Sequence, residues 1–262
     1  MMVNNQDTVT QLNYCVLIPT YNNDQTLENV LRSVLEYTPD VIVVNDGSTD
    51  RTESILERFK TKIEIISYPK NRGKGAALRK GLQRAGELGY EYAITLDSDG
   101  QHFPSEIPKF LERVTPGAPV LIIGNRDMSG AAIPKKSLFG RKFSNFWVKL
   151  ETGRDLMDTQ SGFRLYTVAQ INQFRFFTVN YDFELESLVR WAWRDYPIEI
   201  VTVAVYYPPP EERVSHFKGF TDNFRISVLN TALVTVAILY ILPRRLFRIA
   251  IAGLKKRLGT FG

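Results

Sequence analysis

The sequence predicts an α/β fold built on a mostly parallel β-sheet, and three observations lead to this prediction. Short, uninterrupted apolar runs recur along the first half of the chain, as in strands that are buried on both faces. Amphipathic helical patterns lie between the runs, an alternation that produces helices on both faces of a sheet. Polar motifs follow several of the runs directly. Because ligands of such sheets bind outside the carboxyl ends of the strands, these motifs are the candidates for a functional site.

The expected elements follow from these patterns in order. Apolar runs predict strands at residues 14–18, 41–44, 63–66, 92–96 and 120–123. Helical spacing of apolar residues predicts helices within residues 27–34, 55–59 and 76–85. The second half is less regular, with a basic helical stretch at 141–149, an aromatic and acidic helix at 181–193 and a strand at 198–205. We expect a catalytic domain over residues 1–220, with a donor half at 14–125 and an acceptor half at 126–220.

Composition narrows the class of protein. The chain has 262 residues, of which 44% are hydrophobic, and this is enough for an ordinary buried core. Cys15 is the single cysteine, so a disulfide framework and a Cys-rich metal site are excluded, which fits a reducing compartment. The first twelve residues are polar, and we expect no signal peptide there.

The net charge of +5 is concentrated in the C-terminal tail. Residues 223–262 hold seven Lys and Arg residues and no acid. These cations flank apolar segments, whereas a nucleic-acid site would place them among aromatic residues on a folded face. The pattern predicts no nucleic acid as a partner, and it favours an anionic membrane surface.

The tail has two parts. Residues 226–242 are free of charge, and their length is at the short limit for a membrane span. We expect Pro243 and the two arginines after it to end that stretch. Residues 246–258 then have the pattern of an amphipathic helix that lies in the plane of a membrane. The alternatives are two helices that pack on the sheet, or a contact with a second copy of the chain.

Two carboxylates after the fourth apolar run are the most informative feature. Asp97 and Asp99 have one residue, Ser98, between them at the predicted mouth of a buried strand. Magnesium and manganese prefer oxygen ligands and commonly bridge one or two carboxylates to substrate phosphates. The implied substrate is a nucleotide with a diphosphate. An Asp-rich turn that caps a helix is the alternative reading of the same residues.

Three further polar motifs follow or precede predicted elements, at residues 19–22, 45–50 and 71–76. Asp46 can accept hydrogen bonds from a nucleobase or a ribose, and Gly47 permits a tight turn. Asp50 has the position of a helix cap. Lys74 can pair with phosphate, although a solvated charge at a helix entry is an equal alternative.

Together, the motifs Pro-Thr-Tyr-Asn, Asn-Asp-Gly-Ser-Thr-Asp, Asn-Arg-Gly-Lys-Gly-Ala and Asp-Ser-Asp resemble those of the family 2 glycosyltransferases, which have the GT-A fold. The resemblance covers residues 14–205. It implies a Rossmann-like sheet and a set of nucleotide-sugar contacts at Pro19, Tyr21, Asn22, Asp46, Gly47, Lys74, Asp97 and Ser98. The chain departs from the pattern at Asn45, where many members have an acid, and at Asn23 and Asp24, where Glu is common.

Later residues resemble the polyprenyl-phosphate sugar synthases, of the dolichyl-phosphate-mannose type. This branch implies Mg²⁺ or Mn²⁺ at Asp97, Asp99 and Gln101. It implies a catalytic set made up of Asp97, Asp99, Arg126, Arg141 and Arg213. It implies acceptor contacts at Arg126, Arg141, Ser144, Ser161, Arg164, Glu184 and Arg213. The chain has Asp-Ser-Asp where the branch usually has Asp-Ala-Asp, and its Arg213 loop only approximates the usual one.

The resemblance implies inverting transfer of a sugar from a UDP- or GDP-sugar to a membrane lipid, with a polyprenyl phosphate as the expected acceptor. A lipid hydroxyl is the alternative acceptor, and it would need a base, for which the sequence offers Glu184, Glu186 and Asp158. A catalytically inactive membrane scaffold is a further alternative. A nucleotidyltransferase is disfavoured, since no Gly-rich loop follows the first strand. We expect the protein at the cytoplasmic face of the membrane, peripheral or with a short C-terminal anchor. A homo-oligomer formed through the C-terminal helices is a further expectation.

Overall fold

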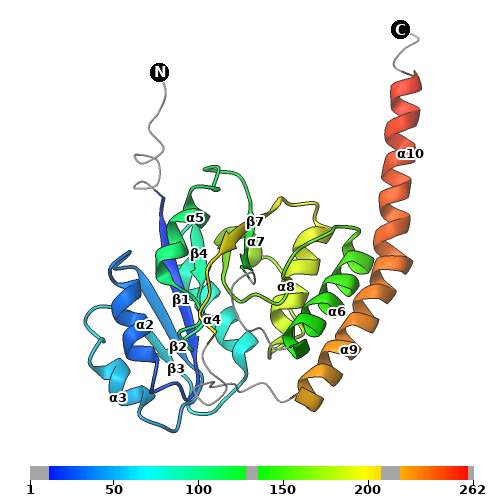
Figure 1. Ribbon diagram of the computed structural model, residues 1–262. Helices are drawn as coiled ribbons and strands as arrows, with labels where there is room; N and C mark the ends of the chain where they lie inside the picture. The colour runs from blue at the N-terminus through cyan, green and yellow to red at the C-terminus, as the bar shows by residue number, and fades with distance from the viewer. Residues whose placement is uncertain (1–11, 128–134, 208–218, 259–262) are drawn as a thin grey trace, which may run out of the picture.

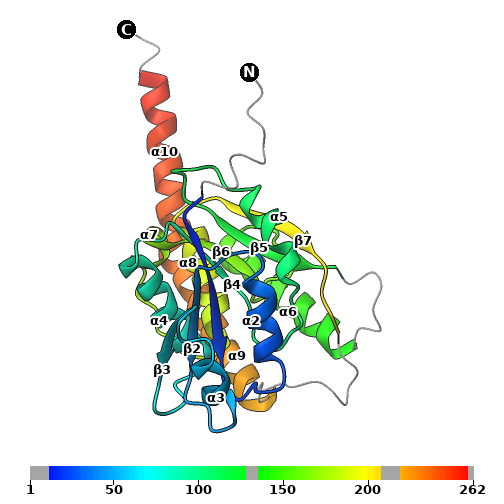
Figure 2. The same ribbon diagram turned by 90° about the vertical axis from the view of Figure 1, so that its left-hand side faces the viewer.

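The computed structural model describes residues 12–127, 135–207 and 219–258. Its centre is a seven-stranded sheet in the order β3-β2-β1-β4-β6-β5-β7, covered by helices on both faces (Figures 1 and 2). The strands are β1 Tyr14–Thr20, β2 Val41–Asn45, β3 Glu64–Ser67, β4 Tyr92–Thr95, β5 Leu121–Arg126, β6 Arg164–Thr167 and β7 Ile198–Val203. The α/β class and the mostly parallel sheet are confirmed.

The first four strands are parallel, as their uninterrupted apolar runs predict. Val16 pairs with Val41 in β2, and Ile94 of β4 pairs with the other side of Val16. Each connection between them runs through a helix: α2 Leu27–Val34, α3 Thr52–Glu57 and α4 Lys74–Glu87. This right-handed alternation brings the carboxyl ends of β1, β2 and β4 to one edge of the sheet.

One strand of the second half was not anticipated. β6 lies between β4 and β5 and is antiparallel to both, so that Leu165 pairs with Ile94 on one side and Ile122 on the other. The buried charge of Arg164 interrupts the apolar run here, and no continuous run marks the strand. The remaining elements are η1 Pro104–Glu106, α5 Ile107–Leu111, α6 Lys135–Thr152, α7 Val168–Ile171 and α8 Asp182–Trp193.

The strands divide the core into two layers because neighbouring residues point to opposite faces. In β1, Val16 and Ile18 pack in the layer that includes residues of α2, α3 and α5. Cys15 and Leu17 pack in the opposite layer, with α4, α7 and α8. Cys15 is fully buried and unbridged, as its place in an apolar run implies.

The C-terminal tail differs from the expected two parts. α9 Gly219–Val236, a π-helical segment Ala237–Ile241 and α10 Leu242–Leu258 follow one another without a break. The two parts expected for the tail are therefore joined in one continuous helix, and the charge-free stretch ends at Pro243 within it. The Leu242 amide bonds to the Ala237 carbonyl, five residues back, so the hydrogen-bond register shifts just before the proline. Pro243 then lies in the first turn of α10, where a missing N–H and a fixed φ are tolerated.

α9 packs along α6 and α8, whereas α10 extends beyond the globular body (Figure 1). The buried side of α9 includes Asn230 and Leu233, and Ala237 continues it. The opposite side exposes large apolar side chains such as Phe224 and Leu239. Within the described residues, Phe224–Arg248 is the one helix long and apolar enough to cross a membrane.

Candidate active site

Hydrogen bonds join the loops after β1, β2 and β4 into one rim. The Asn22 side-chain oxygen accepts from the Thr49 amide at 2.7 Å. The Asn23 amide group donates to Ser98 Oγ at 2.6 Å. Ser98 is buried, so its hydroxyl ties two loops together, and the structure does not place it as a nucleotide contact. Asn23, which replaces the common Glu, thus has a partner of its own.

Asp46 positions the loop that leads into α4. Its two carboxylate oxygens accept from the backbone N–H groups of Arg72 and Gly73, both at 2.8 Å. Burial raises the pKa of Asp46, and the two amides act against that shift. Gly47 has φ of +73°, and a Cβ there would lie 2.4 Å from the Lys70 carbonyl carbon. The two backbone contacts hold the Asp46 carboxylate in place, and its contact with a nucleotide stays a prediction.

Lys74 lies between two carboxylates at the centre of the site. Its Nζ is 2.6 Å from Asp97 Oδ1 and 2.9 Å from Glu184 Oε1. Gly162 closes this cluster, because a Cβ there would lie 2.8 Å from both acids. Burial opposes the charge on Lys74, yet the two acids raise its pKa above the usual range. Lys74 is therefore neither solvated nor unpaired, and its contact with a phosphate of the donor stays a prediction.

Asp97 and Asp99 remain together at the end of β4. Burial works against ionisation of Asp97, but the nearby Lys74 ammonium holds its pKa below the usual range. Burial and then the charge of Asp97 raise the pKa of Asp99 to about 6. Asp99 Oδ1 accepts from the Gln101 amide at 2.9 Å. Two carboxylates that repel one another in a buried site, with lone pairs to spare, are a donor set that suits Mg²⁺ or Mn²⁺.

Asp97 and Asp99 alone do not supply all the ligands that a divalent cation needs. In the part of the chain that the structure describes, no group of three or more His, Cys, Asp and Glu side chains could hold a metal ion. Two carboxylates are nevertheless the number that Mg²⁺ takes when substrate phosphates supply further oxygen ligands. The residues present therefore fit a cation that is shared with a diphosphate.

Arg126 faces this cluster from the end of β5. Its Nε and Nη2 donate to the two carboxylate oxygens of Asp158, each at 2.7 Å, and its backbone amide donates at 3.0 Å. Asp158 is fully buried. Burial acts to raise the pKa of Asp158, and the Arg126 guanidinium overcomes this and lowers it.

Residues predicted for the acceptor gather around the same loop. Arg141 donates to Asn125 Oδ1 at 2.7 Å, and Ser144 Oγ lies 2.8 Å from Thr159 Oγ1. Thr159, which sequence reasoning missed, donates from its amide and its hydroxyl to Asn145 Oδ1, at 3.1 and 2.9 Å, and these bonds fix α6 to the loop. Ser161 is buried beside Gly162. Arg213 lies outside the described residues.

Arg164 does not fit the acceptor role predicted for it. Its side chain is fully buried in β6, out of reach of a substrate. The guanidinium donates to the backbone carbonyls of Thr159, Ser161 and Glu184, at 2.5 to 2.8 Å. Its role is to hold the loop and the start of α8 in place from beneath the site.

Three further titratable groups near the site have partners within the fold. Glu186 is fully buried, and it accepts from Arg190 Nε at 2.6 Å and from backbone amides at Phe177 and Thr178. Asp50 accepts from the Thr52 amide at 2.9 Å, as expected of a capping residue. His102 is buried against Phe163, and burial lowers its pKa to about 4.

Pro19, Tyr21 and Gln101 lie on or beside the rim. Pro19 is buried inside β1, where it pairs with Val44. Tyr21 follows the strand and is half-buried. The Gln101 carbonyl accepts from the Tyr206 amide at 2.8 Å, and this bond joins the loop after β4 to the chain after β7. The contacts of these three residues with a donor or a cation stay predictions.

Comparisons with known proteins agree with this arrangement. The UDP-N-acetylglucosamine–dolichyl-phosphate N-acetylglucosaminyltransferase of Methanococcus voltae is 29% identical over 173 residues, which cover 58% of this chain and 68% of that protein. The polyprenol monophosphomannose synthase of Mycolicibacterium smegmatis is 27% identical over 229 residues, which cover 83% and 84%. These relatives match the polyprenyl-phosphate branch that the motifs resemble.

Among solved structures, the UDP complex of glucosyl-3-phosphoglycerate synthase from Mycobacterium tuberculosis superposes with a TM-score of 0.65. It is 20% identical and covers 89% of this chain and 82% of that chain, so the likeness concerns the fold. Residues 15–174 match Glycosyl transferase family 2, which is more than half of the sequence. The chain therefore belongs to glycosyl transferase family 2, and it is a glycosyltransferase that uses a nucleotide-sugar donor.

Proposed function

We propose that this glycosyltransferase moves a sugar, with inversion and with a divalent cation, from a nucleotide-diphospho-sugar to a polyprenyl phosphate in a membrane. The relatives named above act, by their names, on dolichyl phosphate and polyprenol acceptors. The ion pairs and hydrogen bonds of the candidate bases also favour a phosphate acceptor.

The observation that carries the proposal is that all three candidate bases are already engaged. Asp158 is held by Arg126, Glu186 by Arg190 and backbone amides, and Glu184 by Lys74. A hydroxyl acceptor needs a group that removes its proton. A phosphate monoester is already anionic and needs only to be held and aimed. Arg126, which is held by Asp158, and Arg141, which binds Asn125, supply positive charge for this purpose.

The donor side relies on Asp97 and Asp99. A cation bound there would stabilise the charge that develops on the departing nucleoside diphosphate. Lys74 adds a second positive charge next to Asp97 and keeps that carboxylate ionised. Asp46 fixes the loop at residues 70–73, so that Lys74 enters the site at the first turn of α4. Glu184 and Gly162 hold Lys74 from the acceptor side.

The C-terminal helix supports a peripheral position at the cytoplasmic face of an anionic membrane. α9 lies along α6 and α8, and its free side exposes apolar side chains such as Phe224 and Val228. A helix fixed along the flank of a domain suits attachment in the plane of the membrane better than a perpendicular span. The basic residues after Leu242 would face anionic headgroups. Pairing of two copies through this helix stays a prediction.

Transfer assays with a panel of UDP- and GDP-sugars, with and without a short polyprenyl phosphate, test the proposal. Asp99→Ala is the informative variant because it removes one of the two metal-binding carboxylates. Asp155→Ala is the matched control, since Asp155 is exposed and pairs with the exposed Lys149. Lipid-dependent, metal-dependent transfer that is lost in Asp99→Ala and kept in Asp155→Ala is expected.

Other outcomes contradict specific parts of the proposal. A rate of donor turnover that is unchanged by polyprenyl phosphate but increased by a lipid alcohol would indicate a hydroxyl acceptor. Full activity in the presence of a chelator would exclude the role of the cation. Equal losses in Asp99→Ala and Asp155→Ala would show that neither variant reports on the site.

A further inference from the structure

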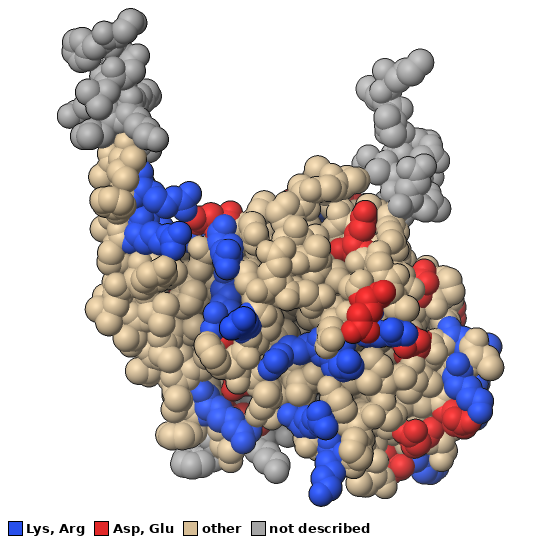
Figure 3. Space-filling view, turned by 180° about the vertical axis from the view of Figure 1, so that it is seen from behind, with Lys and Arg blue, Asp and Glu red and all other residues tan. Residues whose placement is uncertain are grey.

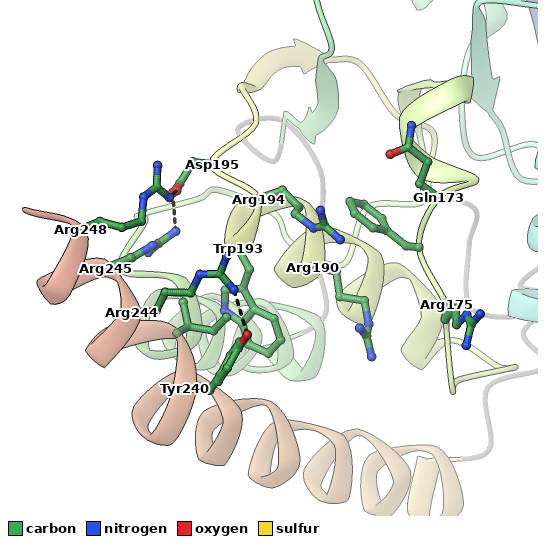
Figure 4. A pocket seen from close by; sticks show the side chains of 12 residues that line it. Gln173, Arg175, Arg190, Trp193, Arg194, Asp195, Tyr240, Arg244, Arg245 and Arg248 are labelled. Atoms are coloured by element: carbon green, nitrogen blue, oxygen red, sulfur yellow. Dashed lines mark hydrogen bonds and ion pairs between the residues drawn. The ribbon is translucent and has the colours of Figure 1, made fainter.

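A hollow of about 590 Å³ lies between the C-terminal helix and the end of α8, away from the active site. Its wall consists of the α9–α10 junction, the last turns of α8 and the segment after α7 (Figure 4). Six of its lining residues are arginines: Arg175, Arg190, Arg194, Arg244, Arg245 and Arg248. Asp195 is the single acid among them. Lys and Arg gather on this face of the molecule, from α10 downward (Figure 3).

Three of the six arginines are occupied by carboxylates. Asp195 receives Arg245 at 2.7 Å and Arg248 at 3.4 Å. Arg190 pairs with the buried Glu186 at 2.6 Å. Arg245 also donates to the backbone carbonyls of Thr152 and Ala192, so it ties α10 to the domain. These three have structural partners.

The other three arginines have no carboxylate partner among the described residues. Arg194 lies over the Phe174 ring at 5.7 Å, and Arg244 lies over Tyr240 at 5.8 Å and donates to its hydroxyl at 2.9 Å. Arg175 comes from the facing segment (Figure 4). Like charges around one hollow repel each other. An anion that several guanidinium groups share would relieve this repulsion, and a phosphate matches the planar fork of each group.

The hollow is separate from the catalytic cluster. α8 carries Glu184 near its start and Arg194 just past its end. Ten residues of α helix separate the two, which is about 15 Å along the axis. The arginines predicted for the acceptor, Arg126 and Arg141, come from β5 and α6 and do not line the hollow.

The hollow lies beside the part of the C-terminal helix that exposes apolar side chains, which is the part expected to contact a membrane. Ile241 lines it, while Leu239 and Leu242, on the same turns of the helix, are 73% and 52% exposed. The apolar side of the helix and the arginines thus share one level of the molecule. We propose that this hollow is a binding site for a phosphate group, held by Arg175, Arg194 and Arg244, which either an anionic phospholipid or a soluble phosphate ester supplies.

The full chain carrying Arg194→Gln and Arg244→Gln together tests the site. The matched control is Arg113→Gln with Lys62→Gln, which removes the same charge from exposed residues after α5 and α3, in the opposite layer. Both pocket arginines are exposed, so we expect both double variants to fold, and thermal melting checks this. Arg194→Lys with Arg244→Lys keeps the charge but removes the fork geometry.

Two probes distinguish the source of the phosphate. One is sedimentation with phosphatidylcholine vesicles, with and without phosphatidylglycerol, and the other is calorimetric titration with inorganic phosphate. For a lipid site, the pocket variant loses affinity for the anionic vesicles by about 25-fold, about fivefold for each arginine, and the control changes little. The affinity of the lysine variant for the anionic vesicles is expected to lie between those of the pocket variant and the control. For a soluble ligand, saturable phosphate binding is lost in the pocket variant and vesicle binding is unchanged. Equal changes in pocket and control variants with both probes would overturn the site.

Discussion

Arg126 and Asp158 form a two-pronged ion pair in which Nε and Nη2 of the arginine each lie 2.7 Å from a different carboxylate oxygen. The carboxylate is fully buried, and the arginine side chain keeps 21% of its surface exposed. Asp158 therefore fixes the orientation of a guanidinium that is partly exposed. This arrangement makes Asp158 a positioning residue for Arg126.

Replacement of Asp158 by Asn is expected to destabilise the fold and weaken the acceptor site together. Asn leaves Arg126 without its charge partner, and loss of one partner of a buried pair costs about 3 kcal/mol. We expect a lower midpoint of urea unfolding and a raised KM for polyprenyl phosphate. Asp155→Asn, at an exposed pair, is the control and should cost less than about 1 kcal/mol. Equal effects of the two variants would contradict the positioning role.

The ammonium of Lys74 is expected to determine the pH below which the rate of transfer falls. Lys74 holds the pKa of Asp97 below its usual range against the effect of burial. In Lys74→Gln this support is lost, so the pKa of Asp97 rises and the carboxylate is protonated at a higher pH. The acid limb of the pH–rate profile should shift upward, together with a fall in the maximal rate.

Lys149→Gln provides the comparison for Lys74→Gln, since it removes a lysine from an exposed ion pair with Asp155. Its pH–rate profile should match that of the unaltered enzyme. A Lys74→Gln profile with an unmoved acid limb and only a lower plateau would mean that Lys74 acts by placing Asp97 and Glu184, and not through its charge.

The pattern of apolar residues was sufficient to predict most of the sheet, because parallel strands buried on both faces need uninterrupted apolar runs. β6 escaped prediction for the same reason, since Arg164 places a charge inside it. That charge is tolerated because three backbone carbonyls surround the guanidinium. The continuous C-terminal helix was missed because Pro243 usually ends a helix, and a local shift of hydrogen-bond register is not visible in a sequence.

The location of the site was predictable from topology, whereas its internal contacts were not. The loops at Asn22, Asp46 and Asp97 follow neighbouring strands, so their proximity follows from the order of the sheet. The contact of Lys74 with Glu184 joins α4 to α8, which are distant in the chain and have no shared motif. Only the packing of the two helices beside Gly162 brings these side chains together.

A second pH effect concerns stability and originates at Glu151 on α6. Both of its carboxylate oxygens are buried without a hydrogen-bond partner in the described part of the chain, and burial raises its pKa from the usual 4.5 to about 8. Between these values the folded state holds a proton that the unfolded state has released. Stability should therefore fall as the pH rises from 4.5 to about 8, by up to about 1.4 kcal/mol per pH unit.

Glu151→Gln should remove this slope, because the amide does not titrate. Urea unfolding at several pH values measures the slope of stability with pH. The variant should be more stable than the unaltered protein near pH 8, and the difference should be smallest near pH 4.5. Glu112→Gln, an exposed acid after α5, should leave the slope unchanged. Parallel curves for the unaltered protein and Glu151→Gln would contradict an unpaired buried carboxyl.

Two leucines of the C-terminal helix should separate membrane binding from folding. Leu246 is 58% exposed on α10, whereas Leu233 is 4% exposed on the side of α9 that packs against the domain. Leu246→Asn removes apolar area that would contact lipid, so partition into phosphatidylcholine vesicles should fall about tenfold with little change in melting temperature. Leu233→Asn buries an amide in the core, which should lower stability by about 3 kcal/mol. Partition that depends on Leu233 and not on Leu246 would place the membrane contact elsewhere on the molecule.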